Sequence, residues 1–169
     1  GAQPKTAFLG VDGRFGVPSG RTPTTHILKP PHRDVPGHVE NEHVCLRLAR
    51  ALGLTAAHSE VRRFDGEVAI VVERYDRVVT RPAAGRGGTS GLSVTRIHQE
   101  DLCQALGVHP ARKYQAEGGP TPRRIGELLR THSSAAGADL ASFLDALIFN
   151  WLVAGTDGHG KNYSLLHAE

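Results

Sequence analysis

Short apolar stretches with strand-like alternation fill the beginning of the chain. Residues 5–11 predict a strand, and Asp12-Gly13 predicts a tight turn that returns residues 14–17 beside it. The β-branched stretch 24–29 predicts a further strand, because such side chains pack well on a pleated surface. Alternation with a period of two brings its last residue, Lys29, to the same face as the apolar side chain of Ile27.

A helix and a hairpin follow these strands. Residues 39–53 predict a helix ended by a glycine, with apolar residues at helical spacing: Val44, Cys45, Leu48, Ala49 and Leu52. Strands are predicted at 59–64 and 67–74, and Asp65-Gly66 between them is a strong hairpin signal. The continuous apolar run 68–72 indicates that the second strand is central and covered on both faces.

The second half of the chain has helical periodicity. Residues 80–93 are rich in glycine, proline and serine and predict a flexible loop. Helices are predicted over 99–106, 121–133 and 139–154, followed by a short strand at 163–167. The longest helix matches the helical template throughout, so we expect its apolar face to be core: Leu140, Phe143, Leu144, Leu147, Ile148, Trp151 and Leu152.

The composition is that of a soluble globular protein, with 39% hydrophobic and 22% charged residues among 169. No apolar run approaches the roughly 20 residues of a transmembrane helix. Because the chain begins with glycine and contains no methionine, we expect a fragment, in which a missing targeting signal says little. Cys45 and Cys103 lack metal-ligand spacing and are predicted to be small buried hydrophobes, which fits a reducing cytosol. The net charge of +3, with arginines scattered along the chain, favours a solvated surface over a nucleic-acid-binding stripe.

The segment Asp157-Gly158-His159-Gly160-Lys161-Asn162 carries the strongest chemical signal. An aspartate followed five residues later by an asparagine has the spacing of a kinase catalytic loop. There the aspartate accepts the proton of the substrate hydroxyl and the asparagine holds Mg²⁺. The same residue types also suit an ordinary turn, since they tolerate positive φ and form local hydrogen bonds. Taken alone, the segment leaves both interpretations open.

The order of the predicted elements favours the catalytic loop. Three strands, a helix and two strands follow the order of a kinase amino-terminal lobe, and helix, loop and strand follow that of the carboxy-terminal lobe. Lys29 would contact phosphates, although a surface lysine can also end a strand in this way. Glu42 in the first helix would pair with it, or would only compensate the helix dipole.

We therefore predict an α+β, bilobal, kinase-like core that is incomplete. A partial first lobe spans 1–79, with the helix 39–53 and a hinge near 73–76. The loop 80–93 connects it to a partial helical lobe, 94–169, which ends just after the catalytic loop.

Long and unusual strings cover nearly the whole chain: GAQPKT at 1–6, TPTTHILK at 22–29, NEHVCLRLA at 41–49, VERYDR at 72–77, QEDLCQALG at 99–107, KYQAEGGP at 113–120 and NWLVAGTDGHGKNYS at 150–164. These strings resemble those of the HipA-type serine/threonine kinases, toxins of bacterial persistence modules. Every lysine of the chain falls within them.

The resemblance implies a role for each candidate in the loop. Asp157 would be the catalytic base and Asn162 a magnesium ligand. His159 would contribute to catalysis by contacting the phosphates of ATP, although it can also be a solvated loop histidine. Lys161 would face substrate or solvent.

The resemblance also implies a set of nucleotide-binding residues. Lys29 would contact the phosphates with support from Glu42, and Lys5 would lie near them in the first strand. Glu73 and Tyr75 would hold adenine through their backbone groups at the hinge.

By the same resemblance, the parent protein would be a cytoplasmic, ATP- and Mg²⁺-dependent protein serine/threonine kinase of a toxin–antitoxin module. An aminoacyl-tRNA synthetase of the glutamyl class is the implied protein substrate, and a HipB-like DNA-binding antitoxin is the implied partner. The chain shows no helix-turn-helix of its own, so we expect it to bind neither nucleic acid nor membrane directly.

The sequence departs from the family at both ends. The second metal-binding aspartate of the family would lie beyond Glu169, and the regulatory autophosphorylated serine would precede Gly1. We therefore expect the 169-residue chain alone to be inactive or nearly so. Two other functions stay open: a non-catalytic kinase-like module that binds nucleotide or a partner, and a small-molecule phosphotransferase, because aminoglycoside kinases share the aspartate and asparagine at similar spacing.

Overall fold

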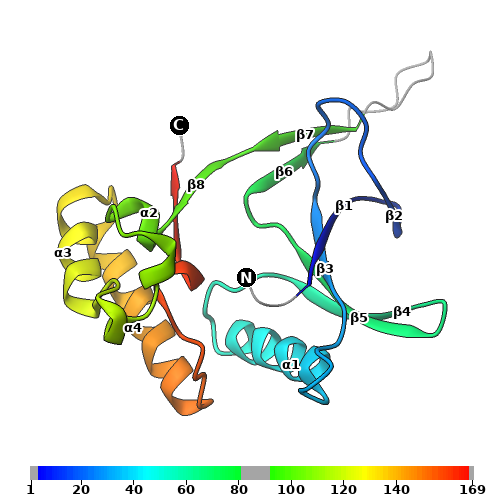
Figure 1. Ribbon diagram of the computed structural model, residues 1–169. Coiled ribbons are helices and arrows are strands. Elements are labelled where there is room, and N and C mark those ends of the chain that lie inside the picture. The colour runs from blue at the N-terminus through cyan, green and yellow to red at the C-terminus, as the bar shows by residue number, and fades with distance from the viewer. Residues whose placement is uncertain (1–3, 81–91, 168–169) are drawn as a thin grey trace. The chain divides into compact units, whose positions relative to one another are not determined.

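A curled antiparallel sheet with one helix forms the first of two units in the chain (Figure 1). The computed structural model describes residues 4–80 and 92–167, and the units are Gly1–Ile97 and His98–Glu169. The sheet has the strand order β2-β1-β3-β5-β4, with each neighbouring pair antiparallel. Its strands are β1 (Thr6–Val11), β2 (Arg14–Gly16), β3 (His26–Lys29), β4 (Ser59–Phe64) and β5 (Glu67–Glu73).

Both predicted hairpin turns are present. The residues of Asp12-Gly13 have φ of 51° and 75°, and those of Asp65-Gly66 have φ of 49° and 90°. Two-residue turns with positive φ at both positions twist in the same sense as the strands that they join, and Asp-Gly is among the sequences that adopt them readily. Val11 therefore pairs with Arg14 across the first turn.

The apolar strand β5 lies between β3 and β4, as its continuous hydrophobic run predicts. Its residues Ala69, Ile70 and Val71 are buried. Helix α1 (His38–Ala51) packs on β4 and β5 and begins and ends within two residues of the prediction. Part of its apolar stripe is exposed, however: Val44, Leu48 and Leu52.

A second, two-stranded sheet completes the first unit and was missed by the sequence prediction. β6 (Arg77–Thr80) pairs antiparallel with β7 (Ser93–Arg96). The predicted flexible loop is therefore wrong at its two ends, because Thr80 and Ser93 are partners in this ladder. Residues 81–91 of that loop lie outside the described residues.

The second unit consists of helices and a two-stranded ladder. β8 (His98–Asp101) pairs antiparallel with β9 (Ser164–His167). Between them lie α2 (Leu102–Ala105), α3 (Pro122–His132), α4 (Ala136–Leu152) and the 3₁₀ turns η1 (Pro110–Arg112), η2 (Gln115–Glu117) and η3 (Gly160–Asn162). The helix predicted over 99–106 is wrong in its first three residues, which belong to β8. Pairing with a strand more than 60 residues away overrides local periodicity there.

The core of this unit consists of Leu102, Ile125 and Leu129, and side chains from α2, α3, α4 and β9 pack against it. Phe143 and Leu140 bring α4 onto this cluster. The prediction that the whole apolar face of α4 is core is wrong, because four of its residues are exposed: Leu144, Ile148, Trp151 and Leu152. Across the described part of the chain, no helix has the length and apolar character needed to cross a membrane.

Candidate active site

The loop between α4 and β9 brings Asp157, His159 and Asn162 together. The Asn162 side chain donates from Nδ2 to the backbone carbonyl of Asp157 at 2.8 Å, and its backbone N–H donates to the carbonyl of His159 at 2.9 Å. Asn162 therefore closes the loop by bonding back to Asp157, the first residue of the segment 157–162. The Asp157 side chain, 75% exposed, projects from this ring toward solvent.

Tyr114 contacts the aspartate of this loop and was missed by the sequence analysis. Its hydroxyl donates to Asp157 Oδ1 at 2.5 Å. This hydrogen bond to a carboxylate is the main cause that raises the pKa of Tyr114. The only sequence signal for this contact was the string 113–120, which the resemblance included without a role. The tyrosine thus fixes one carboxylate oxygen of a side chain that is otherwise largely exposed.

His159 is buried beside this pair. Its side chain is 8% exposed, its ring packs edge-on against Tyr114 at 5.2 Å between centroids, and its Nε2 lies 3.8 Å from Asp157 Oδ1. Among the described residues, its buried Nδ1 has no hydrogen-bond partner. Burial, together with the nearby charge of Lys113, lowers the pKa of His159 more than Asp157 raises it. The imidazole is therefore neutral near pH 7, and His159 is not a solvated loop histidine.

Lys161 anchors the loop to helix α2. Its ammonium donates to Asp101 Oδ2, and its side chain stays one-third exposed, at 33%. Asp101 is the N-cap of α2 and forms a capping box with Gln104. Burial alone would raise the pKa of Asp101, but the hydrogen bonds from Lys161 and from the backbone of Gln104 and Cys103 lower it. The loop is thus tied to the end of β8.

Gly160 is required by a close approach of the loop to Pro120. A Cβ on Gly160 would lie 2.6 Å from Cγ of that proline ring, closer than real Cβ contacts. We expect Gly160→Ala to lower the free energy of unfolding by about 1–3 kcal/mol, since neither the ring nor the loop can yield without strain. Thermal or urea unfolding of the 169-residue chain measures this loss.

The matched control is Gly158→Ala, because a Cβ there would meet only the carbonyl of Gly155 at an ordinary 3.4 Å. Equal stability of the two variants would contradict the close approach at Pro120.

The predicted phosphate-contacting pair lies in the first unit. The Lys29 ammonium, at the end of β3, donates to Glu42 Oε1 in α1. Both side chains are about one-fifth exposed, at 21% and 23%. One residue further along α1, His43 hydrogen-bonds Ser59 of β4 at 2.9 Å. Polar contacts from successive helix residues to different strands thus fix α1 on the sheet and hold Glu42 beside Lys29.

The remaining predicted nucleotide residues lie at strand ends of the same unit. Lys5 is exposed and directly precedes β1. Residues 1–3, which precede it, lie outside the described residues. Glu73 ends β5, and its backbone N–H already donates to the carbonyl of His58 at 2.9 Å. Tyr75 follows in the turn before β6 and is half exposed.

A buried ion-pair cluster follows the predicted hinge residues. Asp76, only 4% exposed, accepts two hydrogen bonds from Arg74, at 3.1 and 2.8 Å, and one from Arg77 at 2.6 Å. Burial would raise the pKa of Asp76, but the two guanidinium groups lower it overall. Arg77 also donates to the carbonyl of Thr24 at 3.0 Å, so the cluster ties the turn to the segment that precedes β3. The string 72–77 contained these residues, but nothing in it indicated burial.

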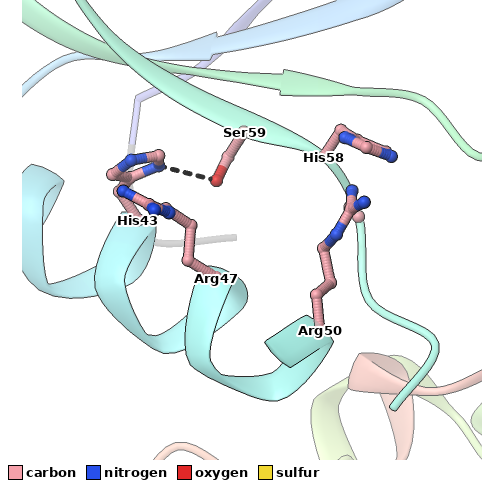
Figure 2. Close-up of a pocket in the computed structure, with 6 residues that line it drawn as sticks. His43, Arg47, Arg50, His58 and Ser59 are labelled. Atoms are coloured by element: carbon pink, nitrogen blue, oxygen red, sulfur yellow. Dashed lines mark hydrogen bonds between the residues drawn. The ribbon is translucent and has the colours of Figure 1, made fainter. Parts of the chain in front are cut away.

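A basic hollow of about 380 Å³ also lies in the first unit, between α1 and the start of β4 (Figure 2). Figure 2 shows Arg50 reaching from α1 toward His58, while Arg47 points toward His43, which hydrogen-bonds Ser59. None of the predicted site residues lines this hollow. It is therefore separate from the residues to which the sequence assigns chemistry.

Comparison with known proteins connects these features to a family. The HipA-like C-terminal domain family matches residues 1–169. The chain is 48% identical over 167 residues to "Putative kinase Y4mE" of Sinorhizobium fredii, covering 99% of this chain and 38% of that protein. It is 33% identical to "Serine/threonine-protein kinase toxin HipA" of Shewanella oneidensis, covering 97% of this chain and 38% of the toxin.

A solved structure agrees with these relatives. The chain superposes with a TM-score of 0.80 and 30% identity on a chain of the complex of HipA, HipB and operator DNA from Shewanella oneidensis, covering 99% of this chain and 39% of that one. The match confirms the predicted α+β fold class. The chain thus spans about two-fifths of the length of these relatives.

Proposed function

The chain belongs to the HipA-like C-terminal domain family, and from this premise we propose that it is the core of an ATP- and Mg²⁺-dependent protein serine/threonine kinase. The observation that carries the proposal is the closed loop in which Asp157, His159 and Asn162 meet, with Tyr114 holding the aspartate. Because the chain spans 38% of its curated relatives, the proposal concerns the parent protein.

Asp157 would act as the catalytic base. Tyr114 occupies its Oδ1, so we assign Oδ2 to the proton of the substrate hydroxyl. Bound MgATP would supply the phosphoryl group and the cation that neutralises its charge. The tyrosine would keep the carboxylate in one orientation, which matters because phosphoryl transfer depends chiefly on positioning and electrostatics.

Asn162 and His159 fit a magnesium–phosphate site. The Asn162 amide uses its Nδ2 on the carbonyl of Asp157, which leaves the amide oxygen, the type of ligand that Mg²⁺ prefers. The buried Nδ1 of His159, without a partner among the described residues, would hydrogen-bond a phosphate oxygen through its proton. A neutral imidazole can donate there without adding a charge to be desolvated.

Lys29 would contact the nucleotide phosphates, held in position by Glu42. A strand lysine paired with a helix glutamate is the arrangement that active protein kinases use for this purpose. Lys5 would lie near the same phosphates. Glu73 and Tyr75 would hold adenine through backbone groups, although the amide of Glu73 is already occupied, which leaves its carbonyl for this task.

We further propose that the parent is a cytoplasmic toxin with a HipB-type antitoxin and a protein substrate such as an aminoacyl-tRNA synthetase of the glutamyl class. The antitoxin is supported by the matching Shewanella structure, which is a complex of HipA with HipB and operator DNA. The substrate rests on the family resemblance alone.

The experiment that tests the proposal is phosphate transfer from γ-labelled ATP by the parent protein. Reactions would contain Mg²⁺ and either whole-cell protein or an aminoglycoside as the acceptor. We expect label on serine or threonine of a protein, no label on the aminoglycoside, and no transfer once Mg²⁺ is chelated. Label on the aminoglycoside would identify a small-molecule phosphotransferase. Binding of MgATP without any transfer would identify a non-catalytic kinase-like module.

A further inference from the structure

Three potential metal ligands lie together on the ladder formed by β8 and β9, apart from the catalytic loop. His98 and Glu100 come from β8, and His167 comes from β9. One ligand atom from each lies within 4.8 Å of the other two. His167 Nε2 is 3.1 Å from Glu100 Oε2, and the two imidazole rings have their centroids 5.0 Å apart.

The register of the ladder explains this convergence. His98 and His167 are direct cross-strand partners, so their side chains leave the same face of the ladder. Glu100 lies two residues after His98, and alternation returns its side chain to that face. The backbone therefore presents three ligands on one small surface, whichever rotamers the side chains adopt.

The surroundings leave the cluster accessible to an ion. His98 and His167 are exposed, and the side chain of Glu100 is 37% exposed. On the same face, Leu165 packs against the core of the unit and fixes the strand beneath the cluster. Ligands on a paired strand held by core packing need little reorganisation on binding.

We propose that His98, Glu100 and His167 form a site for a divalent transition metal of the Zn²⁺ type. Two imidazoles and one carboxylate are a donor set that zinc accepts, with water in the fourth position. Imidazole ligands disfavour Mg²⁺, which selects oxygen. Zinc–ligand bonds of about 2.0–2.2 Å place tetrahedral ligand atoms about 3.3 Å apart, so side-chain rotation must close the widest separation by about 1.5 Å.

A bound ion would link the strand that precedes α2 to the strand that follows the catalytic loop. β9 begins two residues after Asn162, and β8 ends at Asp101, the residue that holds Lys161. The site is separate from the proposed magnesium ligand and does not depend on the kinase proposal. Its direct consequence is a more stable β8–β9 ladder.

The test is Zn²⁺ binding by the 169-residue chain in competition with a chromophoric chelator. The chain contains ten histidines, so the informative quantity is the difference between variants. We expect His98→Ala and His167→Ala each to abolish binding of the most tightly held equivalent of Zn²⁺. Glu100→Gln is expected to weaken the binding of that equivalent at least about tenfold. The matched control, His132→Ala, removes an exposed histidine at the end of α3 and is expected to leave that equivalent intact.

Two further readouts need no substitution. Zn²⁺ is expected to raise the Tm of the unmodified chain where the same concentration of Mg²⁺ does not. Co²⁺ is expected to give the intense visible absorption of a four-coordinate site. The proposal is overturned if the His98→Ala and His167→Ala variants bind zinc as tightly as the unmodified 169-residue chain does. It is equally overturned if His98→Ala alone has no effect, since the pair of Glu100 and His167 is then only a surface ion pair.

Discussion

Asp157→Asn is expected to lower the rate of phosphate transfer by the parent protein about 10²–10⁴-fold, the range that a positioned general base contributes. The asparagine keeps the shape of the side chain, and its amide oxygen can still accept the hydrogen bond from Tyr114. It cannot accept the proton of the substrate hydroxyl. The loss should therefore appear in kcat, while the affinity for MgATP changes little.

The matched control for this prediction is Asp145→Asn, which removes an exposed carboxylate from α4, away from the catalytic loop. Transfer by this variant should equal that of the unmodified protein. If Asp157→Asn keeps full transfer, Asp157 is not the base, and the catalytic assignment of the loop is wrong. Equal unfolding temperatures of both variants would show that any loss is chemical rather than structural.

The sequence analysis correctly predicted the elements whose conformation depends mainly on residues close together in the sequence. Asp12-Gly13 and Asp65-Gly66 need only their own conformational freedom to form the two hairpins, and both turns have positive φ as expected. The run 68–72 was predicted to be a covered central strand, and β5 lies between two neighbours with its middle residues buried. In these cases, the identity of a few consecutive residues is enough to predict the structure.

Long-range pairing accounts for what the sequence analysis missed. Residues 99–101 have helical periodicity but pair with β9, and the bond from Tyr114 to Asp157 joins residues 43 positions apart. The contact between Gly160 and Pro120 depends on how closely the loop backbone approaches the proline ring, which leaves no pattern in a single sequence. Each of these contacts can therefore be identified only in the folded structure.

The exposed face of α4 shows a different limit of sequence analysis. Periodicity located the apolar stripe correctly, since Phe143 and Leu140 contact the core. It could not predict how much of the stripe is covered by neighbouring side chains, and Trp151 is 80% exposed. A hydrophobic stripe identifies the side of a helix that can be buried, whereas the extent of burial depends on what packs against it.

Asp76→Ala is expected to lower the stability of the first unit by about 3–5 kcal/mol, the cost of breaking a buried ion pair by removing one partner. The side chains of Asp76 and Arg77 are 5% and 7% exposed, so the substitution leaves a guanidinium buried without its counter-charge. Urea unfolding, followed by circular dichroism, measures the loss. The control Asp34→Ala removes a carboxylate that is 89% exposed and should change stability little. Equal losses in the two variants would contradict the cluster.

The same cluster predicts how this stability depends on pH. The pKa of Asp76 is lower in the folded chain than its ordinary value of 3.8, because the arginines outweigh the effect of burial. A carboxyl with a lowered folded pKa contributes stability that is complete well above its unfolded value and is lost as the pH falls through the folded one. The difference in stability between the unmodified chain and Asp76→Ala should therefore be constant above about pH 5 and shrink in stronger acid. A difference that stays constant on acidification would mean that packing, rather than the charge pair, holds Asp76 in place.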